Sequence, residues 1–390
     1  MNKSDVISVL DKVYKYSQDK GFKGHNKHDG LNSPILRAVL GWSKWPRIIA
    51  VQVVTRSPIN LRQLLAVPHT FNPKGIALFI RGTLNLYETT GEQCYLDEAI
   101  KLTEILDKTE NNDFSGSAWG YQYPWQDPGF FAPSGMPNAV VSSFVCQAYL
   151  RLFEVTGDNK YLEKVASTLA FFFNDLVRLK DTPEELCLSY MPVDMSMRVM
   201  DVSILIGAVV TRYTRLSGNR IYQDQANRLV TYVINQQTSE GAWFYTDPPS
   251  DSHITHDNYH TGFILDALSE YMSDKDDFSH QKVYDKGLQF YAERLFTAKG
   301  APKWMYNKDF PYDIHGAAQG IITFARHKAE FPQLGGKVLK WAMTNMYAPE
   351  GRFYYQKTSL FTKKFTLLRW CNAWMYFALS THLKHIDENK

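Results

Sequence analysis

Cysteine is scarce in this chain of 390 residues and forms no recognisable pattern. The four cysteines (Cys94, Cys146, Cys187 and Cys371) are scattered, and no two of them form a C-x-x-C pair. Zinc knuckles and disulfide frameworks depend on such spacings, so neither is expected. A chain with so few cysteines suits a reducing compartment, and we predict a cytoplasmic protein.

Long apolar runs and an excess of one charge are also missing. No stretch of about 18 apolar residues occurs, so no transmembrane helix is expected. The polar N-terminus, MNKSDVISVLDKVYKYSQDKG, lacks the apolar core of a signal peptide. The 43 basic and 40 acidic residues give a net charge of +3. Proteins that bind nucleic acid usually carry a strong basic excess, so no nucleic-acid partner is expected.

Aromatic residues, by contrast, are abundant. They make up 14% of the chain, with 23 Tyr, 23 Phe and 9 Trp. Aromatic rings stack on the C–H faces of sugars, and they also fill hydrophobic cores. The excess is therefore consistent with a glycan ligand without establishing one.

A repeated phrase is the strongest feature of the sequence. TGEQCYLDEAIKLTEIL from Thr90, TGDNKYLEKVASTLAFF from Thr156 and SGNRIYQDQANRLVTYV from Ser217 share a small hydroxyl residue, Gly, three spacers and Tyr. Looser copies begin at Ser279 and Phe331. The Gly is typical of a helix C-terminus that needs a positive φ, and the apolar residues after it follow a helical period. Each phrase therefore predicts a helix end, a tight turn and the start of a second helix.

The repeats predict alternating inner and outer helices. Phrases such as EGAWFYTDPP and EGRFYYQK, a Gly followed by aromatics, predict short extended connectors between repeats. Helices that are apolar all round are buried, whereas amphipathic helices lie outside. The inner helices are predicted at 73–89, 137–155, 194–216, 258–273, 313–328 and 365–384, and the outer helices at 4–18, 94–109, 160–178, 220–237, 281–296 and 335–347. Six copies favour a closed all-α (α/α)6 barrel, with residues 1–390 as one domain, over an open solenoid.

The repeat order, the aromatic connectors and the polar starts of the inner helices resemble the six-hairpin glycosidase-like superfamily over most of the chain. Three segments resemble, more narrowly, proteins encoded with bacterial capsule and exopolysaccharide biosynthesis genes: SPINLRQLLAVPHTFNPKGIALF (Ser57–Phe79), DIHGAAQGIITF (Asp313–Phe324) and RWCNAWM (Arg369–Met375). The superfamily includes glycoside hydrolases, unsaturated glucuronyl hydrolases, polysaccharide lyases and sugar epimerases. The resemblance thus implies an oligosaccharide or polysaccharide substrate, not one reaction. It also implies a mouth formed by the N-termini of the inner helices.

The fourth inner start, HITHDNYHTGF, is the densest polar cluster. Asp257 either caps its helix or serves as a general acid or base. His256 and His260 are four residues apart, a spacing that suits a metal, but no third ligand is evident. We therefore predict no metal and no cofactor. We assign a catalytic role to His260 and substrate binding to His256 and Tyr259.

The fifth start, PYDIHGAAQGI, places Asp313 as an N-cap or a catalytic carboxylate. His315 and Gln319 lie four residues apart and are predicted to point the same way. We name His315 as a catalytic candidate and Gln319 as a substrate-binding candidate. A structural histidine buried against carbonyl groups is the alternative for His315.

The third start, MPVDMSMRVMDVSILIG, offers Asp194, Arg198 and Asp201. Asp194 and Arg198 would form a favourable pair on one helix face. Asp201 precedes an apolar run, so it needs either a partner, such as Arg198, or a raised pKa. A raised pKa is what the general acid of glycosidic cleavage requires. Asp201 is therefore a catalytic candidate, and Arg198 a substrate-binding one.

The remaining candidates are residues that would bind the substrate. Arg369 suits a uronate carboxylate or a phosphate. Trp370 and Trp374 are four residues apart and form either a sugar-stacking wall or part of the core. Long loops rich in Gly, Pro and aromatics are often functional, which makes the second connector a predicted substrate-binding lip. The connector candidates are Trp119, Tyr121, Trp125, Asp127 and, in a later connector, Trp243.

Residues 34–65 interrupt the repeats. This stretch, PILRAVLGWSKWPRIIAVQVVTRSPINLRQLL, contains basic residues but no acidic one, and Trp42 and Trp45 lie among aliphatic residues. Such a composition is typical of a helix on a membrane surface. The alternative is that it packs on the flank of the barrel, since soluble domains rarely expose apolar patches. Peripheral contact with the inner membrane is therefore one expectation from the sequence.

Three functions remain open at this point. Hydrolysis needs two carboxylates, for which Asp201, Asp257 and Asp313 are candidates. Elimination or epimerisation needs a base such as a histidine, with Arg369 for a sugar carboxylate. A non-catalytic glycan-binding protein would retain the aromatic residues and use the carboxylates as caps. We favour hydrolysis because the superfamily is richest in it. The sequence indicates no oligomeric state.

Overall fold

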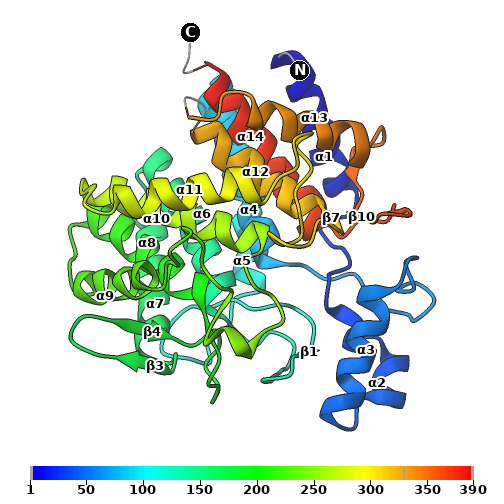
Figure 1. The fold of residues 1–390 in the computed structure, drawn as a ribbon, viewed down its shortest axis with the longest axis horizontal. Helices are drawn as coiled ribbons and strands as arrows, with labels where there is room; N and C mark the ends of the chain where they lie inside the picture. The colour runs from blue at the N-terminus through cyan, green and yellow to red at the C-terminus, as the bar shows by residue number, and fades with distance from the viewer. Residues whose placement is uncertain (1–2, 328–329, 388–390) are drawn as a thin grey trace.

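Six inner helices form a closed ring in the computed structural model, which describes residues 3–327 and 330–387 (Figure 1). Each inner helix contacts the next one in the chain, and the last contacts the first. This closure confirms the (α/α)6 toroid and excludes the open solenoid. The inner helices are α4 (Pro73–Thr90), α6 (Ala139–Thr156), α8 (Met200–Ser217), α10 (Asn258–Lys275), α12 (Ile314–Arg326) and α14 (Trp374–Asp387).

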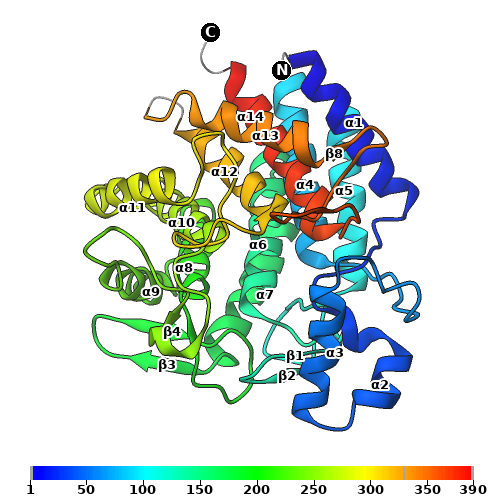
Figure 2. The same cartoon turned by 45° about the vertical axis from the view of Figure 1, so that its right-hand side comes forward.

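An outer helix packs against each inner one. Five of the outer helices follow their inner partners in the chain, whereas the N-terminal α1 packs on the C-terminal α14 and so completes the sixth hairpin (Figure 2). The outer helices are α1 (Lys3–Asp19), α5 (Gln93–Lys108), α7 (Lys160–Asn174), α9 (Gln223–Asn235), α11 (Gln281–Arg294) and α13 (Leu334–Met346).

The helix ends follow the repeated phrase. Gly91, Gly157 and Gly218 end α4, α6 and α8 with φ values of 73°, 70° and 74°, which confirms the predicted left-handed residue at each turn. The third inner helix is shorter than predicted, because Arg198 and Val199 pair as a strand with Thr246 and Asp247. The predicted helical pair of Asp194 and Arg198 is therefore wrong.

Short antiparallel strands connect the hairpins, as the aromatic phrases predict. Two strand pairs lie directly before inner helices and fix where α8 and α12 begin. The pairs are β1 (Trp125–Gln126) with β2 (Phe131–Ala132), β3 (Arg178–Asp181) with β4 (Leu186–Leu188), β5 (Arg198–Val199) with β6 (Thr246–Asp247), β10 (Gln356–Lys357) with both β7 (Tyr312–Asp313) and β11 (Thr362–Lys363), and β8 (Tyr347–Ala348) with β9 (Arg352–Phe353).

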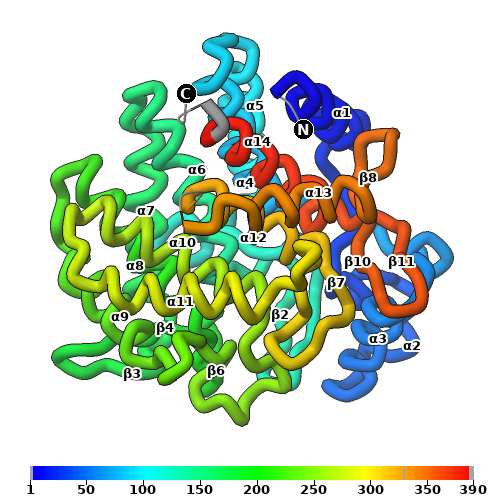
Figure 3. The backbone as a smooth tube through the Cα atoms, turned by 45° about the horizontal axis from the view of Figure 1, so that its top comes forward, coloured from blue at the N-terminus to red at the C-terminus, as the bar shows by residue number. Residues whose placement is uncertain are grey.

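The insert forms a helical hairpin outside the ring (Figure 1 and Figure 3). It consists of α2 (Pro34–Leu40) and α3 (Lys44–Arg56), preceded by the 3-10 turn η1 (Asp29–Asn32). A second 3-10 turn, η2 (Pro249–Asp251), lies before α10. The hairpin has a small core of its own around Leu31, Ala50 and Val51, separate from that of the ring.

Two connector tryptophans have equivalent structural positions. The indole Nε1 of Trp119 donates to the Leu106 carbonyl near the end of α5, and that of Trp243 donates to the Val233 carbonyl in α9, each at 2.9 Å. The side chains are 0% and 2% exposed. Each indole therefore fastens a connector to the preceding outer helix, and neither leaves a face for a sugar.

We expect Trp243→Phe to lower the free energy of unfolding by roughly 1–3 kcal/mol, because the buried Val233 carbonyl loses its donor. Urea denaturation would measure this cost. The KM for a glycan substrate should stay unchanged. A raised KM at unchanged stability would contradict the structural role and restore the predicted substrate-binding one.

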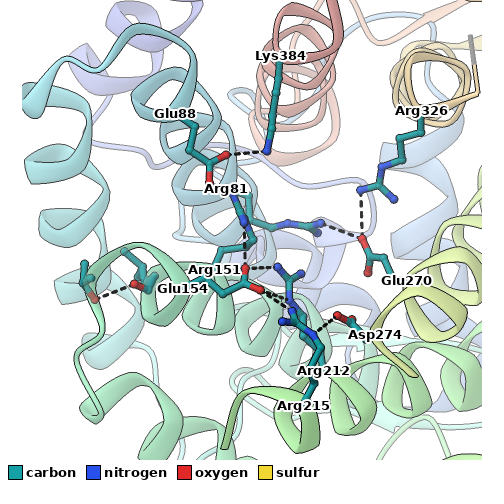
Figure 4. Close-up of polar contacts among 12 residues, drawn as sticks. Arg81, Glu88, Arg151, Glu154, Arg212, Arg215, Glu270, Asp274, Arg326 and Lys384 are labelled. Carbon is teal, nitrogen blue, oxygen red and sulfur yellow. Dashed lines mark hydrogen bonds and ion pairs between the residues drawn. The ribbon is translucent and has the colours of Figure 1, made fainter. Parts of the chain in front are cut away.

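Ion pairs surround a hollow of about 220 Å³ at the pole where the inner helices end (Figure 4). Glu154 is the hub of this cluster and pairs with Arg151 at 2.9 Å, Arg215 at 2.7 Å and Arg212. Glu270 binds Arg326 at 3.1 Å in the same cluster. The cations stabilise the negative ends of the helix dipoles, and the acidic side chains of the cluster pair with them.

Glu154→Gln should remove stability at neutral pH. Burial acts to raise the pKa of Glu154, but Arg212, Arg151 and Arg215 hold it at about 2, below the ordinary 4.5. A carboxylate with a lowered folded-state pKa stabilises the fold above its unfolded pKa, and this stability is lost as pH falls toward the folded value. We expect a cost of about 2–3 kcal/mol at neutral pH, shrinking in acid, in urea titrations. Glu104→Gln, in an exposed pair with Lys108, is the control and should change little.

Candidate active site

Polar side chains gather at the opposite pole, where the inner helices begin. Almost all of these side chains are buried. Burial raises the pKa of Asp201, whereas His260 and Lys74 are close enough to act to lower it. Burial lowers the pKa of His315, and Lys74, Arg369 and Lys27 lower it further. The structure thus brings together the starts of five inner helices. The group comprises Lys74 of α4, Asp201 of α8, Asp257 and His260 of α10, His315 of α12, and Arg369 just before α14.

Asp201 is a buried carboxyl group with an unused oxygen. It is 3% exposed, and its Oδ1 has no hydrogen-bond partner among residues 3–327 and 330–387. The predicted alternative, a salt bridge to Arg198, is wrong, since Arg198 binds Asp247 at 2.9 Å. Burial raises the pKa of Asp201, while His260 and Lys74 act to lower it. A carboxyl group with a raised pKa and a free oxygen suits general acid catalysis.

Asp257 and His260 form a hydrogen-bonded dyad. Asp257 occupies the N-cap position of α10 but makes no capping bond with its side chain. Its carboxylate instead accepts from the His260 Nδ1 at 2.9 and 3.0 Å. The Asp257 side chain is 2% exposed and that of His260 16%. A carboxylate on Nδ1 fixes the imidazole tautomer and leaves Nε2 as the proton acceptor.

His315 lies in an aromatic box. Its ring is 4.5 Å from the ring centroid of Tyr259, at an interplanar angle of 9°, and 4.5 and 4.4 Å from Trp370 and Trp374. Neither ring nitrogen has a hydrogen-bond partner within the described part of the chain. Burial, then Lys74 and Arg369, hold the pKa of His315 well below its usual value, so the ring is neutral. Unpartnered buried polar groups are uncommon in folded proteins and often mark functional sites.

Asp313, in contrast, is fully engaged. Its carboxylate accepts from the His315 backbone N–H at 2.9 Å, Gln356 Nε2 at 2.8 Å and Trp370 Nε1 at 2.7 Å. The predicted N-cap is therefore confirmed. The third bond shows that Asp313 also positions Trp370. Gln319 binds Asp266 at 2.8 Å, deeper in the ring, and not the groups around His315.

Two lysines lie over aromatic rings in the cluster. The Lys74 Nζ is 3.9 Å from the Phe144 ring centroid, and the Lys27 Nζ is 4.0 Å from that of Trp370. Burial lowers the pKa of Lys27 to about 8 and that of Lys74 well below its usual value. Lys27 belongs to no repeat and is not among the predicted site residues; its one local signal is the surrounding polar run HNKHDG.

Arg369 opens the π-helical turn η3 (Arg369–Ala373) that precedes α14. Its guanidinium lies 4.7 Å from the Trp370 ring centroid and 5.5 Å from that of Tyr121. Its Nε has no hydrogen-bond partner among the described residues. Single π-helical turns are frequent at functional sites because they re-aim side chains. The turn therefore presents a buried cation at the mouth.

Only part of the second connector, the predicted substrate-binding lip, lies at this pole. Tyr121 stacks on Tyr123 at 5.4 Å beneath Arg369, and half-buried Trp125 stacks on His28 at 6.0 Å. Asp127 turns into its own loop, where it accepts from the Gly129 N–H at 3.1 Å. Trp374 is 1% exposed and belongs to the core.

The two histidines considered for a metal point to different partners. His256 Nδ1 lies 2.9 Å from the Trp243 carbonyl, whereas His260 binds Asp257. Across the described ranges no three His, Cys, Asp or Glu side chains are grouped as metal ligands. The geometry thus gives His256 a structural contact with the Trp243 connector.

A basic hollow of about 310 Å³ adjoins the cluster from the side of α1. It shares Gly24, His25 and Leu368 with a narrower hollow that reaches Arg369. Its lining carries four cations, which favours anionic ligands. The lining cations are Lys20, Lys23, Arg352 and Lys364.

No family model and no curated protein matches this sequence. Solved structures do match, at low identity. Cellobiose 2-epimerase from Bacillus thermoamylovorans has a TM-score of 0.62 at 10% identity, covering 81% of this chain and 89% of that one. A GH76 α-mannanase from Bacteroides thetaiotaomicron has a TM-score of 0.62 at 14% identity, covering 83% and 88%. A polysaccharide lyase has a TM-score of 0.60 at 12% identity, covering 100% and 98%. These proteins are carbohydrate-active enzymes with different reactions, and the chain shares the six-hairpin (α/α)6 fold with them.

Proposed function

We propose that this protein is a carbohydrate-active enzyme that hydrolyses a glycosidic bond. Asp201 is the general acid, and His260, oriented by Asp257, is the general base. The observation that carries the proposal is the buried carboxyl group of Asp201, whose Oδ1 has no hydrogen-bond partner within the described part of the chain, beside the Asp257–His260 dyad. The carbohydrate-active enzymes that share the fold support the substrate class.

The two groups divide the proton transfers of hydrolysis. Asp201 gives its proton to the glycosidic oxygen as the bond to the anomeric carbon breaks. His260 Nε2 takes a proton from the water that attacks that carbon, and Asp257 stabilises the imidazolium that forms. The leaving sugar keeps the proton from Asp201, and the proton on His260 restores Asp201 through solvent.

The proposed substrate carries anionic sugars. Lys27 and Arg369 place positive charge at the cluster, and Arg369 suits a carboxylate. The half-buried rings of Tyr121, beneath Arg369, and of Trp125, in edge contact with Tyr121, are the aromatic groups proposed to contact a sugar. Together with the resemblance of three short segments to proteins of capsule and exopolysaccharide gene clusters, this favours a bacterial surface polysaccharide or its lipid-linked precursor.

Elimination or epimerisation of a uronate is the second candidate. It is favoured by one observation: His315, whose two ring nitrogens have no hydrogen-bond partner among residues 3–327 and 330–387, gives the cluster a second histidine besides His260. Two bases on different faces of a sugar can remove and return a proton at carbon. Such a reaction would use Arg369 to hold the sugar carboxylate.

Mass spectrometry of matched oligosaccharides, with uronate and with neutral sugars, tests the proposal. Hydrolysis adds one water per cleaved bond, elimination cleaves without water, and epimerisation leaves the mass unchanged but alters the NMR spectrum. We expect water addition on the uronate series, lowered by about 10²-fold or more in Asp201→Asn. Asp194→Asn, an exposed carboxylate in the connector before α8, is the control. Binding without any turnover, equal in all variants, would instead favour a non-catalytic glycan-binding protein.

A further inference from the structure

The α2–α3 hairpin exposes six large apolar side chains. Trp42 is 73% exposed and Trp45 is 67% exposed, and the others are at least 44% exposed. Monomeric soluble proteins rarely expose apolar side chains in such a group, and those that do usually bind something there. The set, called here the hairpin face, consists of Ile35, Val39, Trp42, Trp45, Ile49 and Val53.

The exposure is not a by-product of a loosely packed helix. Trp45, Ile49 and Val53 are spaced by four residues and line one side of α3. Ala50 and Val54, on the other side, are fully buried. Helix α3 is thus apolar on two sides. The side with Ala50 and Val54 packs against the protein, and the side with Trp45, Ile49 and Val53 is exposed.

The surroundings of the hairpin face are cationic. No acidic residue occurs between Asp29 and Glu88. Arg37, Lys44 and Arg56 are exposed on the same two helices. A second copy of this chain would bring like charges together, which disfavours self-association. Tryptophans and aliphatics ringed by cations instead complement an anionic bilayer surface.

We propose that the hairpin face docks this protein on an anionic lipid bilayer. Trp42, at the turn, and Trp45 would lie at the headgroup level, as tryptophans do at membrane interfaces. None of the helices within residues 3–327 and 330–387 is long and apolar enough to cross a membrane. The contact is therefore interfacial.

The hairpin is tied directly to the candidate active site. The Thr55 hydroxyl of α3 donates to the Lys27 carbonyl at 2.8 Å, and Arg62 donates to the Asn26 carbonyl at 2.7 Å. Lys27 in turn reaches over Trp370. Docking would therefore hold the mouth of the ring near the bilayer. The ring would then have access to a lipid-linked glycan. This part of the inference rests on the proposed function, whereas docking on the bilayer does not.

Vesicle flotation of the full-length protein tests docking. We expect flotation with phosphatidylcholine vesicles that contain phosphatidylglycerol, and little with phosphatidylcholine alone. Trp42→Ser with Trp45→Ser should weaken partitioning at least tenfold. Arg37→Gln, Lys44→Gln and Arg56→Gln together should weaken it by roughly 100-fold, about fivefold per cation. Ile221→Ser with Phe278→Ser, two exposed apolar residues outside the hairpin, is the control and should float like wild type.

Several results would overturn docking. These are failure of the wild type to float on either vesicle, or equal flotation of the wild type and the double-tryptophan variant. A dimer in sedimentation that the tryptophan changes dissociate, without flotation, would show that the face pairs two copies. Urea denaturation of each variant separates loss of docking from loss of folding. Cleavage of a soluble glycan should stay unchanged in the double-tryptophan variant, so failure of docking is distinguishable from failure of the proposed enzyme activity.

Discussion

Asp201→Asn is expected to lower kcat for glycoside cleavage by about 10²- to 10⁴-fold, the usual contribution of a general acid, with KM little changed. Asparagine keeps the shape of the side chain but cannot deliver a proton to the leaving oxygen. A substrate with an acidic aryl leaving group needs no such proton, so it should recover most of the lost rate. A variant that lost rate equally on both substrates would contradict the assigned role, because a merely structural defect affects both.

The pH dependence of Asp201 gives a second readout. Burial raises the pKa of this carboxyl group, so the acid form persists to higher pH than in an ordinary aspartate. Wild-type kcat should fall as pH rises through that pKa, and the variant should lack this limb. Because the folded-state pKa lies above the unfolded one, ionisation destabilises the fold as pH rises. The variant should therefore be more stable than wild type at neutral pH, with the gain vanishing in acid, in urea denaturation. Asp194→Asn should show neither effect.

Arg62→Met is expected to destabilise the protein by about 3–5 kcal/mol, the range for breaking a buried ion pair by removing one partner. Arg62 Nε binds the Asp29 Oδ1 at 2.7 Å, and both side chains are 1% exposed. Burial raises the pKa of Asp29, and Arg62 acts to lower it. Without Arg62 the folded-state pKa rises further, so the loss should grow as pH increases and shrink in acid. The urea midpoint measured across pH checks this.

Two further variants serve as a control and as a test of the buried charge. Arg56→Met, on the exposed side of α3 where Arg56 bonds Gln52, should change the free energy of unfolding by less than about 0.5 kcal/mol. Adding Asp29→Asn to Arg62→Met should recover part of the lost stability, because no buried charge then lacks a partner. An Arg62→Met protein as stable as the Arg56→Met protein would contradict a stabilising role of the buried Arg62–Asp29 ion pair.

The ring could be predicted from the sequence because its repeats are local. A Gly with positive φ and a helical apolar period are properties of neighbouring residues, so the ends of α4, α6 and α8 follow from the chain alone. The error at the third inner helix has a physical cause. Strand β5 pairs with β6, almost 50 residues later, and no local pattern around Arg198 signals that pairing.

The sequence locates the site only to the starts of the inner helices and does not give the partner of each side chain. Asp201, Asp257, His260 and His315 do meet at one pole, as polar residues at the ends of apolar helices suggested. Which carboxylate is engaged depends on partners distant in sequence: Asp313 meets Gln356 and Trp370, whereas one Asp201 oxygen meets none among the described residues. Likewise, a Gly-aromatic phrase alone does not show that Trp119 and Trp243 bind helix carbonyls.

Cleavage in water enriched in oxygen-18 tests the central claim most directly. The protein is incubated with a uronate-containing oligosaccharide, and the products are measured by mass spectrometry and NMR. We predict one oxygen-18 on the anomeric carbon of the newly formed reducing end, in the wild type and in Asp194→Asn, and a product yield lowered by about 10²-fold or more in Asp201→Asn. An unsaturated or epimerised sugar without oxygen-18 at a new reducing end would contradict hydrolysis, as would label incorporated equally well by the Asp201→Asn protein.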